Sequence, residues 1–172
     1  MIKKFINLLL CAAVLLTHIS AAAAAGADDA PLSVIYFTKM PLQSSFSDMS
    51  RLTDGIYDAN SPVVVQMSSS AQFDETYMIE GFFGGNTVAV SSVEVGCLTR
   101  QVEEQAITRA RLDYYNPSSD SWESAVDGYE LTWNGGKSVI TLPETVNTIA
   151  VRFYIQDANR RWNNFRIEEL AM

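Results

Sequence analysis

The sequence predicts an all-β protein folded as an antiparallel β-sandwich of the jelly-roll type. From residue 34 onward, short runs rich in β-branched and aromatic residues alternate apolar and polar positions, which is typical of half-buried strands. Turn-forming pairs such as Asp54-Gly55 and Asp127-Gly128 separate these runs at short spacing. No helical pattern is long enough to organise the chain. Many short strands joined by such turns favour a sandwich.

The expected strands follow one another closely along the chain. They are 34–37, 62–67, 77–83, 87–90, 93–95, 107–115, 129–133, 138–142, 148–155 and 164–172. The clearest pattern lies in 148–155, where Ile149, Val151, Phe153 and Ile155 share one face because alternate residues of a strand point to the same side. Two short helical segments are expected at 47–52 and 101–105, and neither is long enough to organise the fold.

Residues 1–25 are expected to form a secretory signal peptide. Lys3 and Lys4 precede an apolar stretch, and Ser20 with the alanines after it offers small-residue cleavage sites. The apolar stretch is shorter than the about 20 residues of a spanning helix, and a retained N-terminal anchor is the alternative. Residues 26–31 then form a short lead-in and 32–172 a single domain. The protein is therefore expected to be exported, to the periplasm or beyond the cell, with no transmembrane segment after cleavage.

Cleavage of that peptide removes residue types on which several function classes depend. His18 and Cys11 are lost, which leaves no histidine and only Cys97. This excludes a Ser-His-Asp triad, a Cys-His pair, a structural zinc site and an internal disulfide. The remaining 20 acidic residues face ten basic ones, a net charge near −10 that disfavours nucleic-acid binding. Cys97 fits a buried inert thiol better than a nucleophile.

Three stretches carry a resemblance to a known family. Residues 52–55 (LTDG) have the pattern Leu-x-Asp-Gly after a first strand. Residues 110–123 (ARLDYYNPSSDSWE) combine a strand, a polar turn and a tryptophan, and 138–170 combine apolar strands with a closing RIEEL. In these features the sequence resembles the discoidin-like domains, also called coagulation factor V/VIII C-type domains. The Asp-Leu-Gly stretch of that family is replaced here by 81–85 (GFFGG), and the flanking cysteine pair of its animal members is absent.

The resemblance implies a galactose-binding-like jelly roll, and many bacterial members of the family are carbohydrate-binding modules. It also implies a structural calcium ion (Ca²⁺) held by backbone carbonyls and by the side chains of Asp54 and Glu169. Calcium takes about 6–8 oxygen ligands, several of which can come from the backbone. Glu168 is the alternative to Glu169, because the sequence does not fix which of these two neighbours in the last strand faces the ion. The alternative for Asp54 is a plain tight turn, in which its side chain bonds its own backbone.

The candidate ligand-binding residues lie in two loops. Trp162 belongs to the amide-rich stretch 159–164 (NRRWNN), in which Arg160 and Asn163 can hydrogen-bond pairs of sugar hydroxyls. The apolar face of a sugar stacks on an aromatic ring, so Trp162 is the expected platform. The alternative is a loop tryptophan that folds back onto the core. Tyr57 and Asp58 form the second candidate loop.

The sequence thus predicts a secreted, non-catalytic module that binds carbohydrate or glycan through loops at one end of the jelly roll. The contributing loops would be 44–50, 57–60 and 159–164. Trp122 and Trp133 are expected in the core, and the acidic pairs 103–104 and 168–169 are interpreted as solvated surface. The main alternative is an interaction or assembly subunit that contacts another envelope protein. A small hydrolase or lyase that uses a pair of carboxylates is the third hypothesis.

Overall fold

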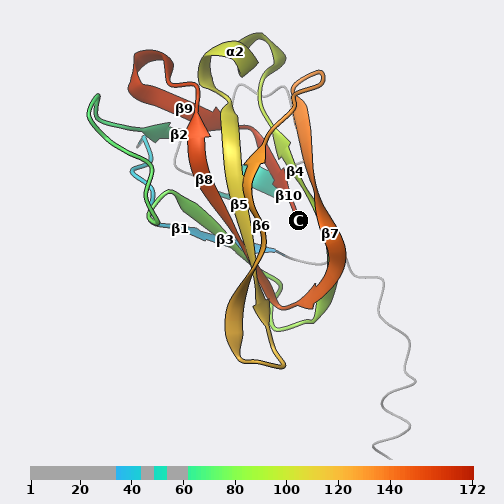
Figure 1. Cartoon of the computed structure of the whole chain (residues 1–172). Coiled ribbons are helices and arrows are strands. Elements are labelled where there is room, and N and C mark those ends of the chain that lie inside the picture. The colour runs from blue at the N-terminus through green and yellow to red at the C-terminus, as the bar shows by residue number, and fades with distance from the viewer. Residues whose placement is uncertain (1–33, 44–48, 54–61) are drawn as a thin grey trace, which may run out of the picture. The chain divides into compact units, whose positions relative to one another are not determined.

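The computed structural model describes residues 34–43, 49–53 and 62–172, and it confirms the antiparallel all-β fold (Figure 1). The expected signal peptide, the lead-in and the predicted site residues Asp54, Tyr57 and Asp58 lie outside the described residues. The elements, in chain order, are β1 (Ile35–Thr38), η2 (Met49–Thr53), β2 (Val63–Gln66), β3 (Met78–Phe82), β4 (Val88–Gly96), η3 (Thr99–Gln101), α2 (Val102–Gln105), β5 (Ile107–Asn116), β6 (Ser121–Glu130), β7 (Lys137–Thr148), β8 (Ala150–Ala158), η4 (Arg161–Asn163), β9 (Asn164–Ile167) and β10 (Glu169–Ala171).

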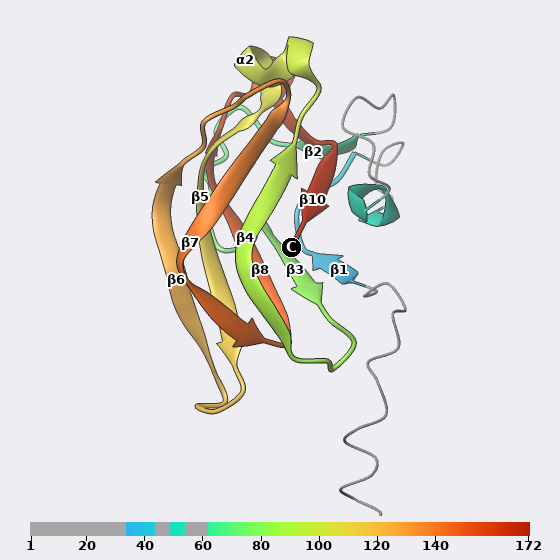
Figure 2. The ribbon, with the colours of Figure 1, turned by 90° about the vertical axis from the view of Figure 1, so that its right-hand side faces the viewer.

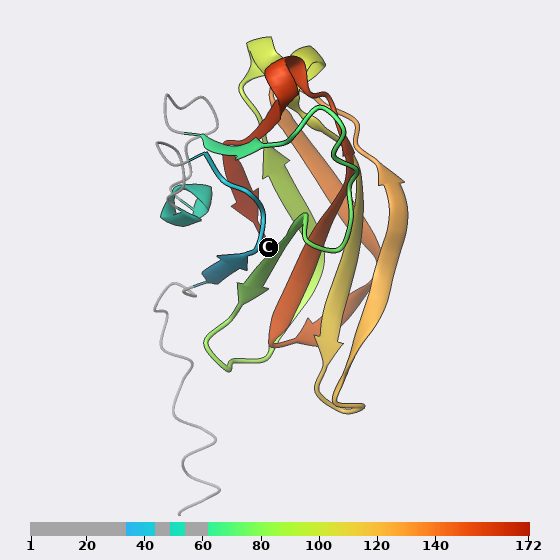
Figure 3. The ribbon, with the colours of Figure 1, turned by 90° about the vertical axis from the view of Figure 1, so that its left-hand side faces the viewer.

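The strands form three antiparallel sheets. One has five strands in the order β1-β3-β8-β5-β6, the second has three in the order β10-β4-β7, and β2 pairs with β9 in a small third sheet. Figure 2 shows β4 and β7 across one side of the molecule, and Figure 3 shows β8 and β5 from the opposite direction. None of the helical segments in the described part of the chain is long and apolar enough to cross a membrane.

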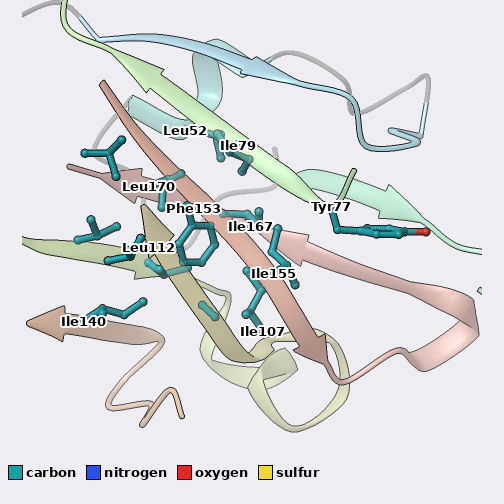
Figure 4. Close-up of a cluster of buried hydrophobic side chains, with 14 of the residues drawn as sticks. Leu52, Tyr77, Ile79, Ile107, Leu112, Ile140, Phe153, Ile155, Ile167 and Leu170 are labelled. Atoms are coloured by element: carbon teal, nitrogen blue, oxygen red, sulfur yellow. The ribbon is translucent and has the colours of Figure 1, made fainter. Parts of the chain in front are cut away.

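The core lies between the sheets and is built from the alternating faces of the strands. In β8, Val151, Phe153 and Ile155 are buried, as the period-two pattern of the sequence predicts, whereas Ile149 precedes the strand and is half-buried. They pack with buried side chains from the other strands and with Leu52 of η2 (Figure 4). Burial of each such side chain contributes about 1.5–3 kcal/mol relative to exposure. Cys97 is buried and free, so the core holds this domain together without a disulfide.

Two strands, β4 and β6, are longer than the sequence predicts. Their extra residues are held in the sheet by backbone hydrogen bonds and not by an alternating apolar pattern. β6 runs over Ser121–Glu130, although the predicted strand begins only at residue 129 and the pair Asp127-Gly128 is interpreted as a turn. β6 is an edge strand of the five-stranded sheet, and all of its residues are exposed or half-buried. β4 continues through Ser91 and Ser92 where two separate runs are expected, because its backbone pairs with β7 across a register shift.

The other two tryptophans, Trp122 and Trp133, are less buried than the core positions that the sequence predicts for them. Trp122 was expected in the core, and this is wrong: it is half-buried, with the guanidinium carbon of Arg152 at 3.8 Å from its ring centroid. A guanidinium at this distance is attracted to the face of the ring. Trp133 is partly buried against the core, and its indole N–H donates to the carbonyl of Ile107 at 2.9 Å.

Candidate functional site

The segment that connects β8 to β9 is held in place on both sides. At its start, the backbone N–H of Asn159 donates to the carbonyl of Ala106 at 2.9 Å, and its side-chain amide donates to the carbonyl of Val102 at 3.1 Å. At its end, the carbonyl of Asn163 accepts a hydrogen bond from the backbone N–H of Met67 at 2.8 Å. The chain between these anchors forms η4, which carries Trp162 at its centre.

Trp162 is displayed on the surface. Its side chain is 69% exposed, so it does not fold back onto the core. Its backbone is left-handed, with φ 56° and ψ 31°, and Asn163 follows with φ 60°. Asparagine tolerates this region, but tryptophan pays about 1–2 kcal/mol for it. Strain of this kind persists where the surrounding structure enforces it, and it is concentrated at functional sites.

Two residues that the sequence did not single out brace the indole. The guanidinium carbon of Arg161 lies 4.2 Å from the ring centroid of Trp162. The same guanidinium pairs with the carboxylate of Glu104 in α2. The hydrogen bond from Arg161 holds the pKa of Glu104 below its ordinary value, so this carboxylate stays ionised. An ionised Glu104 in turn keeps Arg161 over the ring.

Arg160, a predicted ligand contact, forms its hydrogen bond with the segment between β2 and β3. Its Nη1 donates to the carbonyl of Ala71 at 2.9 Å, and its guanidinium carbon lies 5.3 Å from the ring centroid of Phe73. Arg160 therefore ties η4 to the segment before β3. Asn163 is exposed beside Trp162, and its backbone carbonyl is the atom that anchors the loop. The structure thus brings Trp162, Asn163 and Arg161 together and orients Arg160 toward Ala71.

A polar pocket of about 430 Å³ lies between the η3–α2 segment and the turn before β7. Its lining includes Arg100, Glu103, Glu104 and Trp133. Glu104 links the pocket to the Trp162 loop, because it also pairs with Arg161. This volume falls within the about 300–1,000 Å³ of ligand pockets. The loop with the exposed Trp162 and the pocket lined by Trp133 therefore lie at the same end of the sandwich. This is the end with α2 in Figure 1.

Glu169, a predicted calcium ligand, is buried in β10 with 4% of its surface exposed. Its negative charge, after burial itself, contributes to a raised pKa of the Tyr36 hydroxyl, which donates a hydrogen bond to the carbonyl of Leu170. η2 ends at Thr53, immediately before Asp54, and packs against β10. A buried carboxylate oxygen beside this element is the donor type that calcium prefers. Within 34–43, 49–53 and 62–172, no group of three or more His, Cys, Asp or Glu side chains could hold a metal ion.

Glu168, the competing candidate, belongs to a different neighbourhood. Its side chain is fully buried, and one carboxylate oxygen lies 3.6 Å from Nη1 of Arg166. Burial first, and the charge of Glu168 second, raise the pKa of the Cys97 thiol to about 12. The interpretation of 168–169 as solvated surface is therefore wrong, because both side chains are buried where β10 and the residue before it pair with the end of β4.

Comparison with known proteins finds the same fold in solved structures. No protein-family model and no curated protein sequence matches the chain. The family 32 carbohydrate-binding module of NanJ from Clostridium perfringens, solved with galactose, matches with a TM-score of 0.58, 14% identity, and coverage of 80% of this chain and 90% of that one. A family 32 module of a family 31 glycoside hydrolase, solved with GalNAc, matches with a TM-score of 0.59 and 11% identity, and the match covers 82% of this chain and 97% of that one. The family 32 module of EndoD from Streptococcus pneumoniae matches with a TM-score of 0.59 and 12% identity, and the match covers 80% of this chain and 93% of that one. The chain thus has the galactose-binding-like jelly roll of the discoidin-like and family 32 modules.

Proposed function

We propose that this protein is a non-catalytic carbohydrate-binding module that holds a sugar against Trp162. The observation that carries the proposal is the display of Trp162, which is 69% exposed in a left-handed backbone conformation. It stands on a fold whose solved neighbours include complexes with galactose and with GalNAc.

The chemistry of the loop suits a sugar. A pyranose presents an apolar C–H face and a rim of hydroxyls, and an indole can cover the first while polar side chains bond the second. Arg161 lies over one face of the indole, and the 69% exposure of Trp162 leaves ring surface for a ligand. Asn163, which is exposed and follows Trp162 in the chain, offers a side-chain amide to hydroxyls at the rim. Arg160, Tyr57 and Asp58 stay predicted contacts.

The test is a titration of the protein with galactose and GalNAc, followed by calorimetry and tryptophan fluorescence. Trp162→Ala should weaken binding at least about tenfold, or 1.4 kcal/mol, because the stacking surface is lost. Trp162→Phe should retain part of the affinity. Trp122→Phe, which alters an aromatic ring stacked under Arg152, is the matched control and should bind as the wild type does. Equal affinity in Trp162→Ala and the wild type would contradict the proposal.

Export and an envelope partner stay predictions. N-terminal sequencing of the protein recovered outside the cytoplasm should place cleavage near residue 25. A glycan array that gives no binding to the folded protein, together with a stable complex on a sizing column, would favour the assembly subunit instead. Turnover of a glycan that disappears when one carboxylate becomes an amide would favour the hydrolase or lyase.

A further inference from the structure

A second polar pocket, of about 460 Å³, lies far from Trp162. It is lined by the end of β5 and the turn after it, by residues 144–147 of β7, and by Thr87 before β4. β5 begins beside the anchor of η4 at Ala106 and reaches the pocket at Asn116. Ten strand residues at about 3.3 Å each place the two regions about 30 Å apart, toward opposite ends of β5 in Figure 1. One sugar unit cannot span that distance, so this pocket is separate from the Trp162 site.

One wall of the pocket is held by a hydrogen-bond network centred on Glu123 in β6. The Tyr114 hydroxyl donates to one carboxylate oxygen at 2.7 Å. The Asn116 side-chain amide and the Ser119 hydroxyl both donate to the other oxygen, each at 2.8 Å. These three bonds hold the pKa of Glu123 below its ordinary value, so the carboxylate stays ionised and keeps its donors. The Tyr114 ring and the Asn116 amide are thereby fixed in position before any ligand arrives.

The opposite wall is fixed by backbone pairing. Val146 and Asn147 pair with Val90 and Ala89 of β4, so this part of β7 is held by the sheet. The hydroxyl of Thr148 donates to the carbonyl of Tyr115 at 2.8 Å, which ties the end of β7 to β5. The side chains of Glu144 and Asn147 are exposed on this wall and line the pocket. The spacing between the two walls is therefore set by the fold.

The lining groups select for a neutral polyhydroxylated ligand. Tyr114 and Pro117 offer apolar ring surface, while Asn147 and Glu144 offer a donor and acceptors for hydroxyls. The pocket lining contains no Lys or Arg, which disfavours phosphorylated or acidic ligands. A divalent cation is also disfavoured, because Glu144 is the one carboxylate in the lining and Glu123 is engaged by three donors.

We propose that this pocket is a second sugar-binding site, which takes a neutral monosaccharide unit and makes the module bivalent. The pocket itself involves none of the residues around Trp162, and only the bivalence rests on the proposed function. Two sites about 30 Å apart on one rigid sandwich can engage two branches of one glycan or two neighbouring chains. Such linkage raises the overall affinity for a polymer above that of either site alone.

The test is a nuclear magnetic resonance titration of the ¹⁵N-labelled chain with galactose, GalNAc, glucose and mannose. The indole N–H of Trp162 reports one end, and the side-chain amides of Asn116 and Asn147 report the pocket. We expect one of these sugars to move the pocket amides with its own saturation curve. The double variant Glu144→Gln, Asn147→Ala should weaken this event at least tenfold, read from the Asn116 amide, and leave the titration of the Trp162 indole unchanged. Glu130→Gln, the same change at an exposed carboxylate of β6 outside the pocket lining, is the matched control.

The outcomes separate this proposal from the previous one. Movement at Trp162 alone overturns the pocket and leaves the proposed function in place. Movement at the pocket alone, which persists in Trp162→Ala, supports the pocket as a sugar-binding site and contradicts both Trp162 as a platform and the bivalence of the module. Pocket amides that respond to calcium chloride and to none of the sugars overturn the proposal in favour of a cation. A folded protein in which neither end responds to any of the four sugars overturns both.

Discussion

Gly136 lies so close to Cys97 that the structure has no room for a side chain between them. The backbone N–H of Cys97 donates to the carbonyl of Gly136 at 2.7 Å. A Cβ atom added to Gly136 would lie 2.5 Å from the carbonyl oxygen of Cys97 and 2.8 Å from the hydroxyl of Thr99. The φ of Gly136 is also positive, at 85°. This contact holds the turn before β7 against the segment that leads into η3, and the turn and η3 both line the 430 Å³ pocket.

Gly136→Ala should therefore destabilise the fold by about 2–4 kcal/mol, because backbone strain and a backbone clash add. Gly135→Ala is the matched control. Its φ of 59° is equally left-handed, but a Cβ there would meet nothing within 4 Å. It should cost only about 1 kcal/mol. Urea unfolding of the two variants measures the difference. Equal costs would mean that the turn moves freely away from Cys97.

Trp162→Gly should separate binding from stability. Glycine adopts a φ of 56° without strain, whereas alanine keeps the cost of the left-handed backbone. Trp162→Gly should therefore be more stable than Trp162→Ala by about 1 kcal/mol, while both lose sugar binding. Thermal unfolding should place the glycine variant about 3 °C higher. A glycine variant less stable than the alanine variant would mean that η4 is not strained at this position.

Glu104→Gln should weaken sugar binding modestly, because Arg161 would no longer be held over Trp162 by an ion pair. An exposed pair of this kind is weak and screened by salt, so we expect a loss of about two- to fivefold that shrinks at high salt. The pKa of Glu104 is lowered, so the pair is present at neutral pH and is lost only as the pH falls through that lowered value. Glu103→Gln is the control, and calorimetry at several salt concentrations measures both.

The fold was predictable because one buried face per strand imposes a period of two on the sequence. That rule locates β8 from Val151, Phe153 and Ile155 without any knowledge of their partners. It fails for β6, whose place at the sheet edge leaves few side chains to bury. A segment such as this is recognised as a strand only when its neighbour β5 is known, since backbone pairing carries no side-chain signature.

The candidate site was predictable only in its local part. Trp162 stands among polar residues in the sequence, and this is why a displayed ring could be expected. Arg161 and Glu104 are 57 positions apart in the chain, and nothing in a single sequence indicates that η4 and α2 meet. The acidic pair 103–104 has the composition of ordinary solvated surface. The ion pair that braces the indole therefore had to come from the structure.

Cys97 should not react with a thiol reagent in the folded protein at pH 8. The thiolate is the reactive form, and burial raises the pKa of this thiol to about 12, so the folded chain holds it protonated at pH 8. With the chain cleaved after residue 25, which removes Cys11, Ellman's reagent should give no fast colour in native buffer and one equivalent in denaturant. Rapid labelling without denaturant would show that the strand pair β4 and β10 opens locally.

Calcium should stabilise the protein if Asp54 and Glu169 bind it as the family resemblance implies. An ion that binds the folded state alone adds about 2.7 kcal/mol at a concentration 100 times its Kd, a shift of several degrees in Tm. Asp54→Asn and Glu169→Gln should each remove the difference in Tm between buffer with calcium chloride and buffer with chelator.

Glu168→Gln is the discriminating control, because that carboxylate lies beside Arg166 and Cys97. It should lower the baseline Tm and keep the calcium-dependent shift. If Glu168→Gln abolishes the shift and Glu169→Gln does not, the ligand in the last strand is Glu168. If the wild type itself shows no shift, Asp54 closes a plain turn, and η2 packs against β10 without the help of an ion.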